Sequence, residues 1–389
     1  VDEVAWPASL RHLVFGDAFD QPVEGIVWPS SLELLEFGKA FNHPMDRVMW
    51  PACLQRVKFG ESFNQPVAGV AWPASIDSLV FGSDFDQPVT GVSWPGTLQH
   101  VEFGKSFDQS IAGTSWPASV RRMVFGAAFD QPIERIVWPI SLQQLTLGYC
   151  FNHPVAKVTW PPSMTSLTFG VCFNHQIDHV VWSVSLQHLT LGYYFNQPIA
   201  GIVWPVSLKS LTFGNGFNQP IDRVVWPAGL QKLTLDRAFN HPIDRVVWPT
   251  FLTQLTFGYY FDQPIIRVFW PPSLQNIRFG NHFNQAIAGV KWPASLEKLT
   301  FGVQFNQPVD TVEWPGSLQE LVFGWRFNQP MAGIGLPASL RRLEFGYRFN
   351  HPIADIVWPE SMRQLTLGRG FDQPVDSTAF PSSLALNSL

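Results

Sequence analysis

Cysteine and charged residues are scarce in this 389-residue chain, and long hydrophobic runs are missing from it. Three cysteines cannot form the disulfide framework of a small secreted domain. Charged residues make up only 14% and the formal net charge is −5, which excludes the basic excess typical of nucleic-acid-binding proteins. No apolar run approaches the ~18–20 residues of a membrane-spanning helix, and no signal-peptide segment opens the chain. We therefore expect no nucleic-acid partner and no membrane insertion, and we favour an intracellular protein.

Apolar, aromatic and proline residues are abundant instead. Apolar residues make up 46% of the chain, with 33 Phe, 33 Pro and 17 Trp. This composition can bury a large core, so it excludes a disordered chain.

The tryptophans reveal an internal repeat of 22 residues. The register runs from Trp6 to Phe380 through 18 units without insertion or deletion, which predicts one domain over residues 1–389. Only Trp325 lies outside the tryptophan register, and Leu336 and Phe380 fill the two places that lack Trp. The unit reads W-P-x-S-L-x-x-L-x-F-G-x-x-F-N-Q-P-I-x-x-V-x.

Each unit contains two short strand-like steps, L-x-F and V-x-W, separated by turns. Alternation places the outer residues of each step inward and the middle residue outward. Glycine follows the first step, where we expect a positive φ, and proline follows the second step and ends it. One unit cannot bury its own apolar side chains, so we expect about 18 stacked coils that form a β-rich solenoid with two short parallel sheets.

One coil shows the expected core and its polar border. The inward set is Trp204, Leu208, Leu211, Phe213, Phe217, Ile221 and Val224. The residue after the Phe217 position is Asn in some coils and Asp in others. Since Asp has only acceptors, we expect this side chain to accept a hydrogen bond from a later N–H or from one in the next coil.

The repeat resembles a known family. The segments Phe195–Ile199, Phe217–Ile221 and Phe305–Val309 look like FNIP repeats, and each is followed by the rest of that 22-residue unit. The resemblance covers the whole chain and implies a right-handed, leucine-rich-repeat-like solenoid that usually serves protein interaction. It implies no catalytic residues and no cofactor, and the chain contains no catalytic pattern of its own. Departures from the repeat are local: Ser110, Gln176 and Ala286 replace the motif proline, Asp236 replaces the glycine, and Ser183 replaces the proline after Trp.

Aromatic residues outside the core register are the candidates for partner binding. All six tyrosines fall on the two places after the turn glycine, and Trp325 shares this register. Tyr and Trp outside a core are typical anchors of interfaces, although lateral packing between coils would also explain them. The candidates are Tyr149, Tyr193, Tyr194, Tyr259, Tyr260 and Trp325, with Tyr347 in the same register.

Cys150 and Cys172 occupy equivalent places in neighbouring coils, as do His153 and His175. Stacking would bring these four side chains near one another, so they are the candidate zinc ligands, although the favoured interpretation is that no metal binds. A disulfide between the two cysteines and two unpaired thiols are the alternatives.

The sequence supports two functions of different classes. The first is a non-enzymatic platform that presents one edge or face to a protein or a glycan. The second is a structural subunit that stacks end to end into a fibre or coat. The second rests on a chain that begins in mid-repeat without a cap, on the rigid register, and on the acidic excess of residues 1–100.

Overall fold

Short strands are the regular secondary structure of this protein in the computed structural model, which describes residues 4, 6–375, 380–382 and 384–388. The chain divides into two compact units, residues 1–193 (unit 1) and 194–389 (unit 2). The single domain expected over 1–389 stays a prediction. Unit 1 holds β1 (His12–Val14), β2 (Leu34–Glu36), β3 (Arg56–Lys58), β4 (Ser78–Val80), β5 (His100–Glu102), β6 (Arg122–Val124), β7 (Gln144–Thr146), β8 (Ser166–Thr168) and β9 (His188–Thr190). Unit 2 holds β10 (Ser210–Thr212), β11 (Lys232–Thr234), β12 (Gln254–Thr256), β13 (Asn276–Arg278), β14 (Lys298–Thr300), β15 (Glu320–Val322), β16 (Arg342–Glu344), β17 (Gln364–Leu367) and β18 (Ala385–Ser388).

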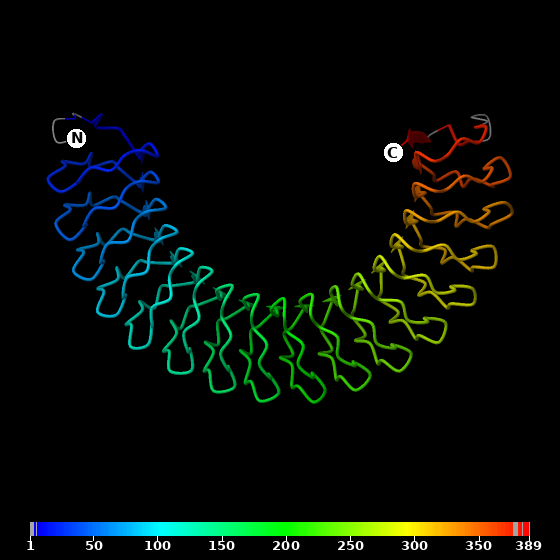
Figure 1. The fold of residues 1–389 in the computed structure, drawn as a ribbon, viewed down its shortest axis with the longest axis horizontal. Coiled ribbons are helices and arrows are strands. Elements are labelled where there is room, and N and C mark those ends of the chain that lie inside the picture. The colour runs from blue at the N-terminus through cyan, green and yellow to red at the C-terminus, as the bar shows by residue number, and fades with distance from the viewer. Residues whose placement is uncertain (1–3, 5, 376–379, 383, 389) are drawn as a thin grey trace. The chain divides into compact units, whose positions relative to one another are not determined.

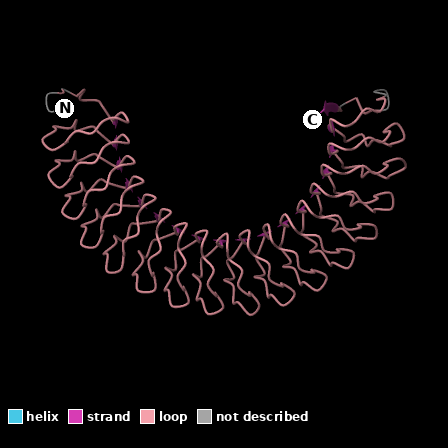
Figure 2. Ribbon diagram, in the orientation of Figure 1, coloured by secondary structure: helices cyan, strands magenta, loops and turns pink. Residues whose placement is uncertain are grey.

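Within each unit, every strand pairs in parallel with the next strand along the chain. The register in unit 2 joins Leu211 to Leu233, one repeat later, and most coils repeat this offset of 22 residues. The coils therefore follow one another in chain order, and the strands lie along one margin of each unit (Figures 1 and 2). This arrangement confirms the predicted β-solenoid. The described elements include no helix that is long and apolar enough to span a membrane.

The core consists of stacked columns of equivalent apolar side chains, and the Phe217 column is Phe in every coil. All seven residues expected to point inward in the coil from Trp204 to Val224 are buried, and Phe217 has no exposed surface. Its ring stacks on Phe213 in its own coil at 4.1 Å between centroids, and on Phe239 in the next coil at 6.2 Å. The alternation read from the sequence therefore identified the core correctly.

The second sheet, expected at the V-x-W steps, does not form within the described residues. Val224 and Trp226 are buried while Val225 is 78% exposed, so the side chains alternate as expected. However, the described strands of each unit form one sheet, and no backbone hydrogen bond joins the step at Val224–Trp226 to the equivalent step at 246–248. The indole rings of Trp270 and Trp292 stack with centroids 6.2 Å apart, so neighbouring coils pack through side chains on this side.

The turn glycines are needed for a reason other than the expected positive φ. The positive-φ glycines lie instead in the turn before Trp, as at Gly201 and Gly333. At Gly302, after β14, a Cβ atom would collide with the carbonyl oxygen of Gly280 in the preceding coil. The glycine column therefore permits a close approach of backbones, in which a Cα–H group faces a carbonyl oxygen. The expectation of a positive φ at this column was wrong.

Candidate interaction surface

The candidate surface is the turn edge, which we define as the two residues after the turn glycine (or Asp236) in each coil. In most coils a backbone hydrogen bond holds the turn edge to that of the neighbouring coil; for example, the N–H of Arg348 donates to the carbonyl of Trp325 at 3.0 Å. The first turn-edge residue of each coil lies just beyond the end of the strand. Where a turn-edge residue is aromatic, its side chain is exposed to solvent. The six aromatic residues selected from the sequence are all exposed, from 39% at Tyr193 to 54% at Tyr194.

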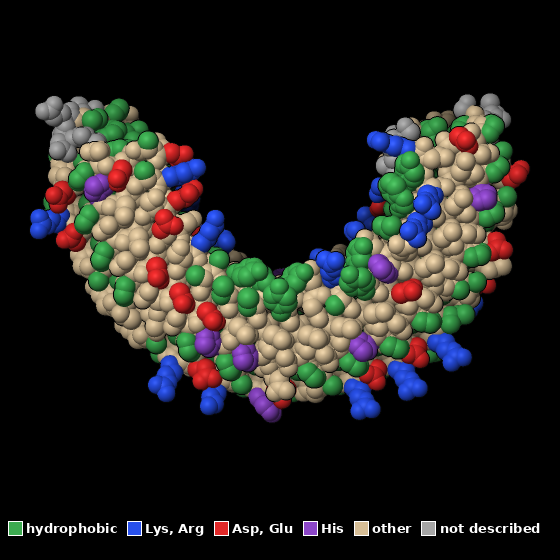
Figure 3. Space-filling model, in the orientation of Figure 1, with side chains coloured by type: hydrophobic (Ala, Val, Ile, Leu, Met, Phe, Trp, Pro, Cys, Tyr) green, Lys and Arg blue, Asp and Glu red, His purple; other side chains and the backbone are tan. Residues whose placement is uncertain are grey.

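Unit 1 and unit 2 each carry part of this edge. Tyr149 and Tyr193 belong to unit 1, while Tyr194, Tyr259, Tyr260 and Trp325 belong to unit 2. In the space-filling view, hydrophobic side chains lie along the strand-bearing margin of unit 2, and Lys and Arg lie beside them (Figure 3). The turn edge of unit 2 is therefore aromatic and basic at once.

Tyr259 and Tyr260 form a compact cluster with two residues that the sequence argument did not select. The Arg237 guanidinium lies over both rings, at 5.3 Å from the Tyr259 centroid and 5.7 Å from that of Tyr260. The His282 ring lies 4.9 Å from Tyr259 and 5.0 Å from Tyr260. Both added residues are turn-edge residues of adjacent coils, 22 positions from one or other tyrosine. The 22-residue register could therefore have revealed them.

Asp236 lies beside this cluster, at the one turn-glycine position that the repeat does not fill with Gly. The Asp236 carboxyl lies against the side-chain amide of Asn215 in the preceding coil. Burial raises the pKa of the Asp236 carboxyl, against the lowering effect of the Arg237 backbone N–H and charge. Asp236 in place of the turn glycine and the neighbouring cluster of Arg237, Tyr259 and Tyr260 thus lie on the same surface.

Trp325 and Tyr347 form the wall of a groove of about 540 Å³ in unit 2. Their rings are stacked, with centroids 4.3 Å apart and planes 4° from parallel. We call this the aromatic groove. It runs between the ends of the strands and the turn edge, and the turn glycines contribute no side chain to its floor. Its lining includes Arg278, Gly302, Val303, Val322, Gly324, Trp325, Glu344, Gly346, Tyr347 and Arg369.

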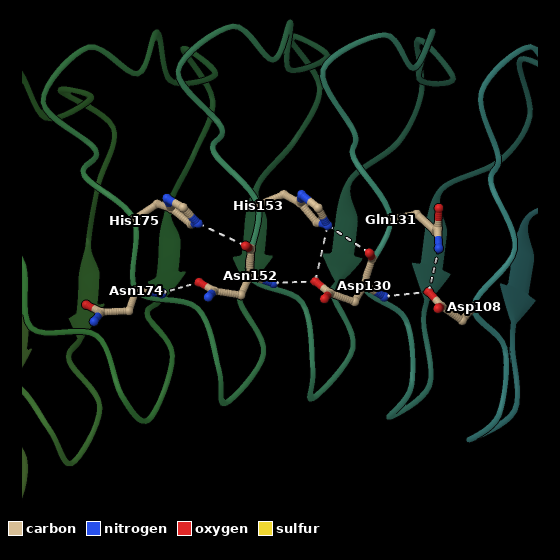
Figure 4. Close-up of polar contacts among 7 residues, drawn as sticks. All are labelled: Asp108, Asp130, Gln131, Asn152, His153, Asn174 and His175. Carbon is tan, nitrogen blue, oxygen red and sulfur yellow. Dashed lines mark hydrogen bonds and ion pairs between the residues drawn. The ribbon is translucent and has the colours of Figure 1, made fainter.

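Among the described residues, the four candidate zinc ligands do not form a group that could hold a metal ion. Each histidine ring nitrogen lies next to a backbone carbonyl of the preceding coil: His153 Nε2 is 2.8 Å from Asp130 O, and His175 Nε2 is 2.9 Å from Asn152 O (Figure 4). Among the described residues no group of three or more His, Cys, Asp or Glu side chains is placed to hold a metal ion. Cys150 and Cys172 are free thiols, which excludes the disulfide alternative in this structure. Burial, with Cys150 and Asp130 nearby, raises the pKa of the Cys172 thiol and disfavours the thiolate that a metal requires.

These histidines replace the glutamine of a hydrogen-bond ladder that joins the coils. The N–H of Asn152 donates to Oδ1 of Asp130 at 2.8 Å, and the N–H of Asn174 donates to Oδ1 of Asn152 at 3.0 Å (Figure 4). Gln131 Nε2 donates to Oδ1 of Asp108 at 2.9 Å. The predicted acceptor role of the Asn/Asp position is therefore confirmed, and His in place of Gln has a structural explanation.

Comparison with known proteins supports the same repeat. A sequence model of the FNIP repeat matches residues 6–40, 63–106, 107–150, 173–216, 195–238, 239–282 and 312–348. A solved protein, CroV588, described as a novel circular LRR protein, is 40% identical with a TM-score of 0.90. That match covers 98% of this chain and 57% of CroV588, so this chain spans little more than half of that protein's length. An internalin (InlF) from Listeria monocytogenes is 16% identical over 77% of this chain and 83% of its own, with a TM-score of 0.48. No curated protein matches the chain in sequence.

Proposed function

The chain belongs to the FNIP repeat family, and from that premise we propose that it is a non-enzymatic scaffold that binds a protein partner through its turn edge. The observation that carries this proposal is the exposure of aromatic side chains, Trp325 among them, on a backbone that repeats rigidly from coil to coil. Tyr and Trp supply large contact areas with few rotatable bonds, so they bind partners at low entropic cost.

The placement of these rings on one edge supports a binding role over simple lateral packing. Tyr259 and Tyr260 contact His282 and Arg237, yet each ring remains about two-fifths exposed, at 40% and 42%. Lateral packing alone would bury the rings more completely. The apolar area left in solvent is the area that a partner can cover.

A protein fits this edge better than a glycan. Sugar rings pack flat on the open faces of aromatic side chains, whereas Trp325 and Tyr347 cover one face of each other. The ring edges and the uncovered faces of Trp325 and Tyr347 can contact the side chains of a protein partner. Glycan binding is therefore an outcome for the test to exclude.

The test compares two double variants of the immobilised protein in an extract of its source cells. Tyr259→Ala with Tyr260→Ala removes the aromatic cluster, and Val225→Ala with Val247→Ala removes exposed side chains of the opposite face. We expect the first variant to lose bound protein and the second to keep it. Equal capture by both variants, or capture that glycosidase treatment of the extract abolishes, would contradict the proposal.

We also propose a second function, assembly into a closed ring, because the similar protein CroV588 is described as circular. In this case the repeats would serve as a structural wall. Light scattering coupled to size exclusion decides between the two: a particle of one chain, 43.9 kDa, favours the scaffold, and a defined multimer favours the ring.

A further inference from the structure

We propose that the aromatic groove of unit 2 binds an acidic peptide segment of the partner protein. This inference rests on the proposed scaffold function and names the chemistry of the partner.

The groove offers an apolar wall over a floor without side chains. Trp325 and Tyr347 are stacked along the wall, with Val303 preceding them in the same column. The floor carries Gly302 and Gly324, whose hydrogens face the carbonyl oxygens of the preceding coils. An extended backbone can therefore lie close to the floor and press an apolar side chain against the wall.

The charges around the groove are basic and uncompensated. Arg278 is exposed on the lining, and Arg326 and Arg348 are exposed directly after Trp325 and Tyr347 in the chain. None of these three guanidinium groups forms an ion pair with any residue that the structure describes. The carboxylate among the lining residues, Glu344, is already paired with Arg342 at 2.5 Å. The groove therefore offers at least three cationic groups to an incoming anion.

Unit 1 provides an internal comparison, because the same backbone groove occurs there with other side chains. That groove, about 470 Å³, is lined by charged residues and has no Tyr or Trp in its lining. Most of its charges pair with one another: Lys39 lies 3.5 Å from Asp17 and 3.8 Å from Glu61, and Lys58 lies 3.0 Å from Glu36. The groove itself is thus a consequence of the repeat, whereas free arginines beside stacked aromatic rings are specific to unit 2.

An acidic peptide matches this surface better than a nucleic acid does. Neighbouring coils set Arg326 and Arg348 about 5 Å apart along the backbone, and carboxylates on one side of an extended peptide are about 7 Å apart, a difference that long arginine side chains can span. Three arginines neutralise only a few phosphates of a long strand, whereas they can pair with a large share of the carboxylates of a short acidic segment.

The experiment measures fluorescence anisotropy with a labelled twelve-residue peptide of four Asp-Glu-Phe repeats, at low salt. The groove variant is Arg326→Glu with Arg348→Glu. The control is Arg223→Glu with Arg245→Glu, which changes the net charge equally on another surface. The substituted arginines of the groove form no ion pairs, so we expect folding to be retained, and circular dichroism melts verify it.

We expect the peptide to bind the parent chain, the groove variant to bind at least about tenfold more weakly, and the control to change by less than about threefold. Trp325→Ala should also weaken binding, while a Lys-Lys-Phe peptide of the same length should not bind. Equal loss in both charge variants, no binding to the parent chain, or tighter groove-dependent binding of a labelled twelve-nucleotide single strand would overturn the inference. If the peptide fails while partner capture still depends on Tyr259 and Tyr260, only this inference falls and the scaffold function stands.

Discussion

The backbone N–H of Asn240 donates to Oδ1 of Asn218 in the preceding coil at 3.0 Å. This bond joins neighbouring coils at a position just after the turn edge, where the backbone-to-backbone bonds of the strands and the turn edge have ended. Since only the side-chain oxygen is used, Asn and Asp can exchange at this position without loss of the bond.

Removing this acceptor should destabilise the solenoid. We expect Asn218→Leu to lower the free energy of unfolding by about 1–3 kcal/mol, because it leaves the N–H of Asn240 without its acceptor. Asn218→Asp keeps the acceptor and should change it by less than about 0.5 kcal/mol. Urea unfolding followed by circular dichroism measures both. Equal midpoints for the two variants would show that the bond contributes nothing.

The buried phenylalanine column should tolerate truncation least. Phe217 is fully buried and stacks on Phe213 and Phe239. Phe217→Ala should therefore lower the free energy of unfolding by about 3–5 kcal/mol through cavity formation. The control is Val225→Ala, which truncates an exposed side chain of the same coil. Similar melting of the two variants would mean that the phenylalanine column does not hold the coils together.

Substitutions at three glycines distinguish two roles of glycine, namely close approach of backbones and a positive φ. Gly302→Ala places a Cβ against the backbone of Gly280 and should cost about 3 kcal/mol. Gly333 has a φ of 72° in open space, so Gly333→Ala should cost about 1 kcal/mol. Gly316→Ala meets no atom and should be close to neutral. Any other order of the three thermal midpoints would contradict the role assigned to the glycine column.

Asp236 should make stability depend on pH. Its pKa is raised in the folded protein, so between the ordinary value of 3.8 and the raised value the folded state binds more protons than the unfolded state. Stability therefore falls as pH rises through this window, and the ionised carboxylate is unfavourable at pH 7.

Asp236→Asn removes this charge and nearly preserves the shape of the side chain. We expect the variant to be more stable than the parent at pH 7, with an advantage that shrinks as pH falls below the raised pKa. Thermal melts from pH 3 to pH 8 measure the difference. An advantage that grows on acidification would show that the sign is wrong.

The inward residues, such as Leu211, Phe213 and Phe217, could be predicted from the sequence because their burial follows the apolar pattern of the repeat. The absence of a second sheet could not be predicted, because alternation at Val224–Trp226 shows which side chains are buried but not whether neighbouring backbones are close enough for ladder hydrogen bonds. Likewise, the collision that requires Gly302 arises between backbones of different coils. A sequence pattern shows only that glycine recurs there.

The candidate site was predictable in part. The exposed Tyr259, Tyr260 and Trp325 stand out because aromatic residues are unusual on a turn edge. Arg237, His282 and Arg348 do not stand out alone, since single polar residues are common on any surface. They matter because each lies in contact with an aromatic side chain or next to one in the chain. The 22-residue register indicates which residues are neighbours in adjacent coils, but it does not give the distances between their side chains.

Site-directed photocrosslinking tests the central claim most directly, namely that partners bind along the turn edge. Benzoylphenylalanine is placed at position 260 on the turn edge or at position 225 on the opposite face, and each protein is irradiated in an extract of the source cells. We predict a discrete protein adduct from position 260 and none from position 225. Adducts from position 225 alone, or no protein adduct from position 260, would contradict the assignment of the turn edge as the binding surface.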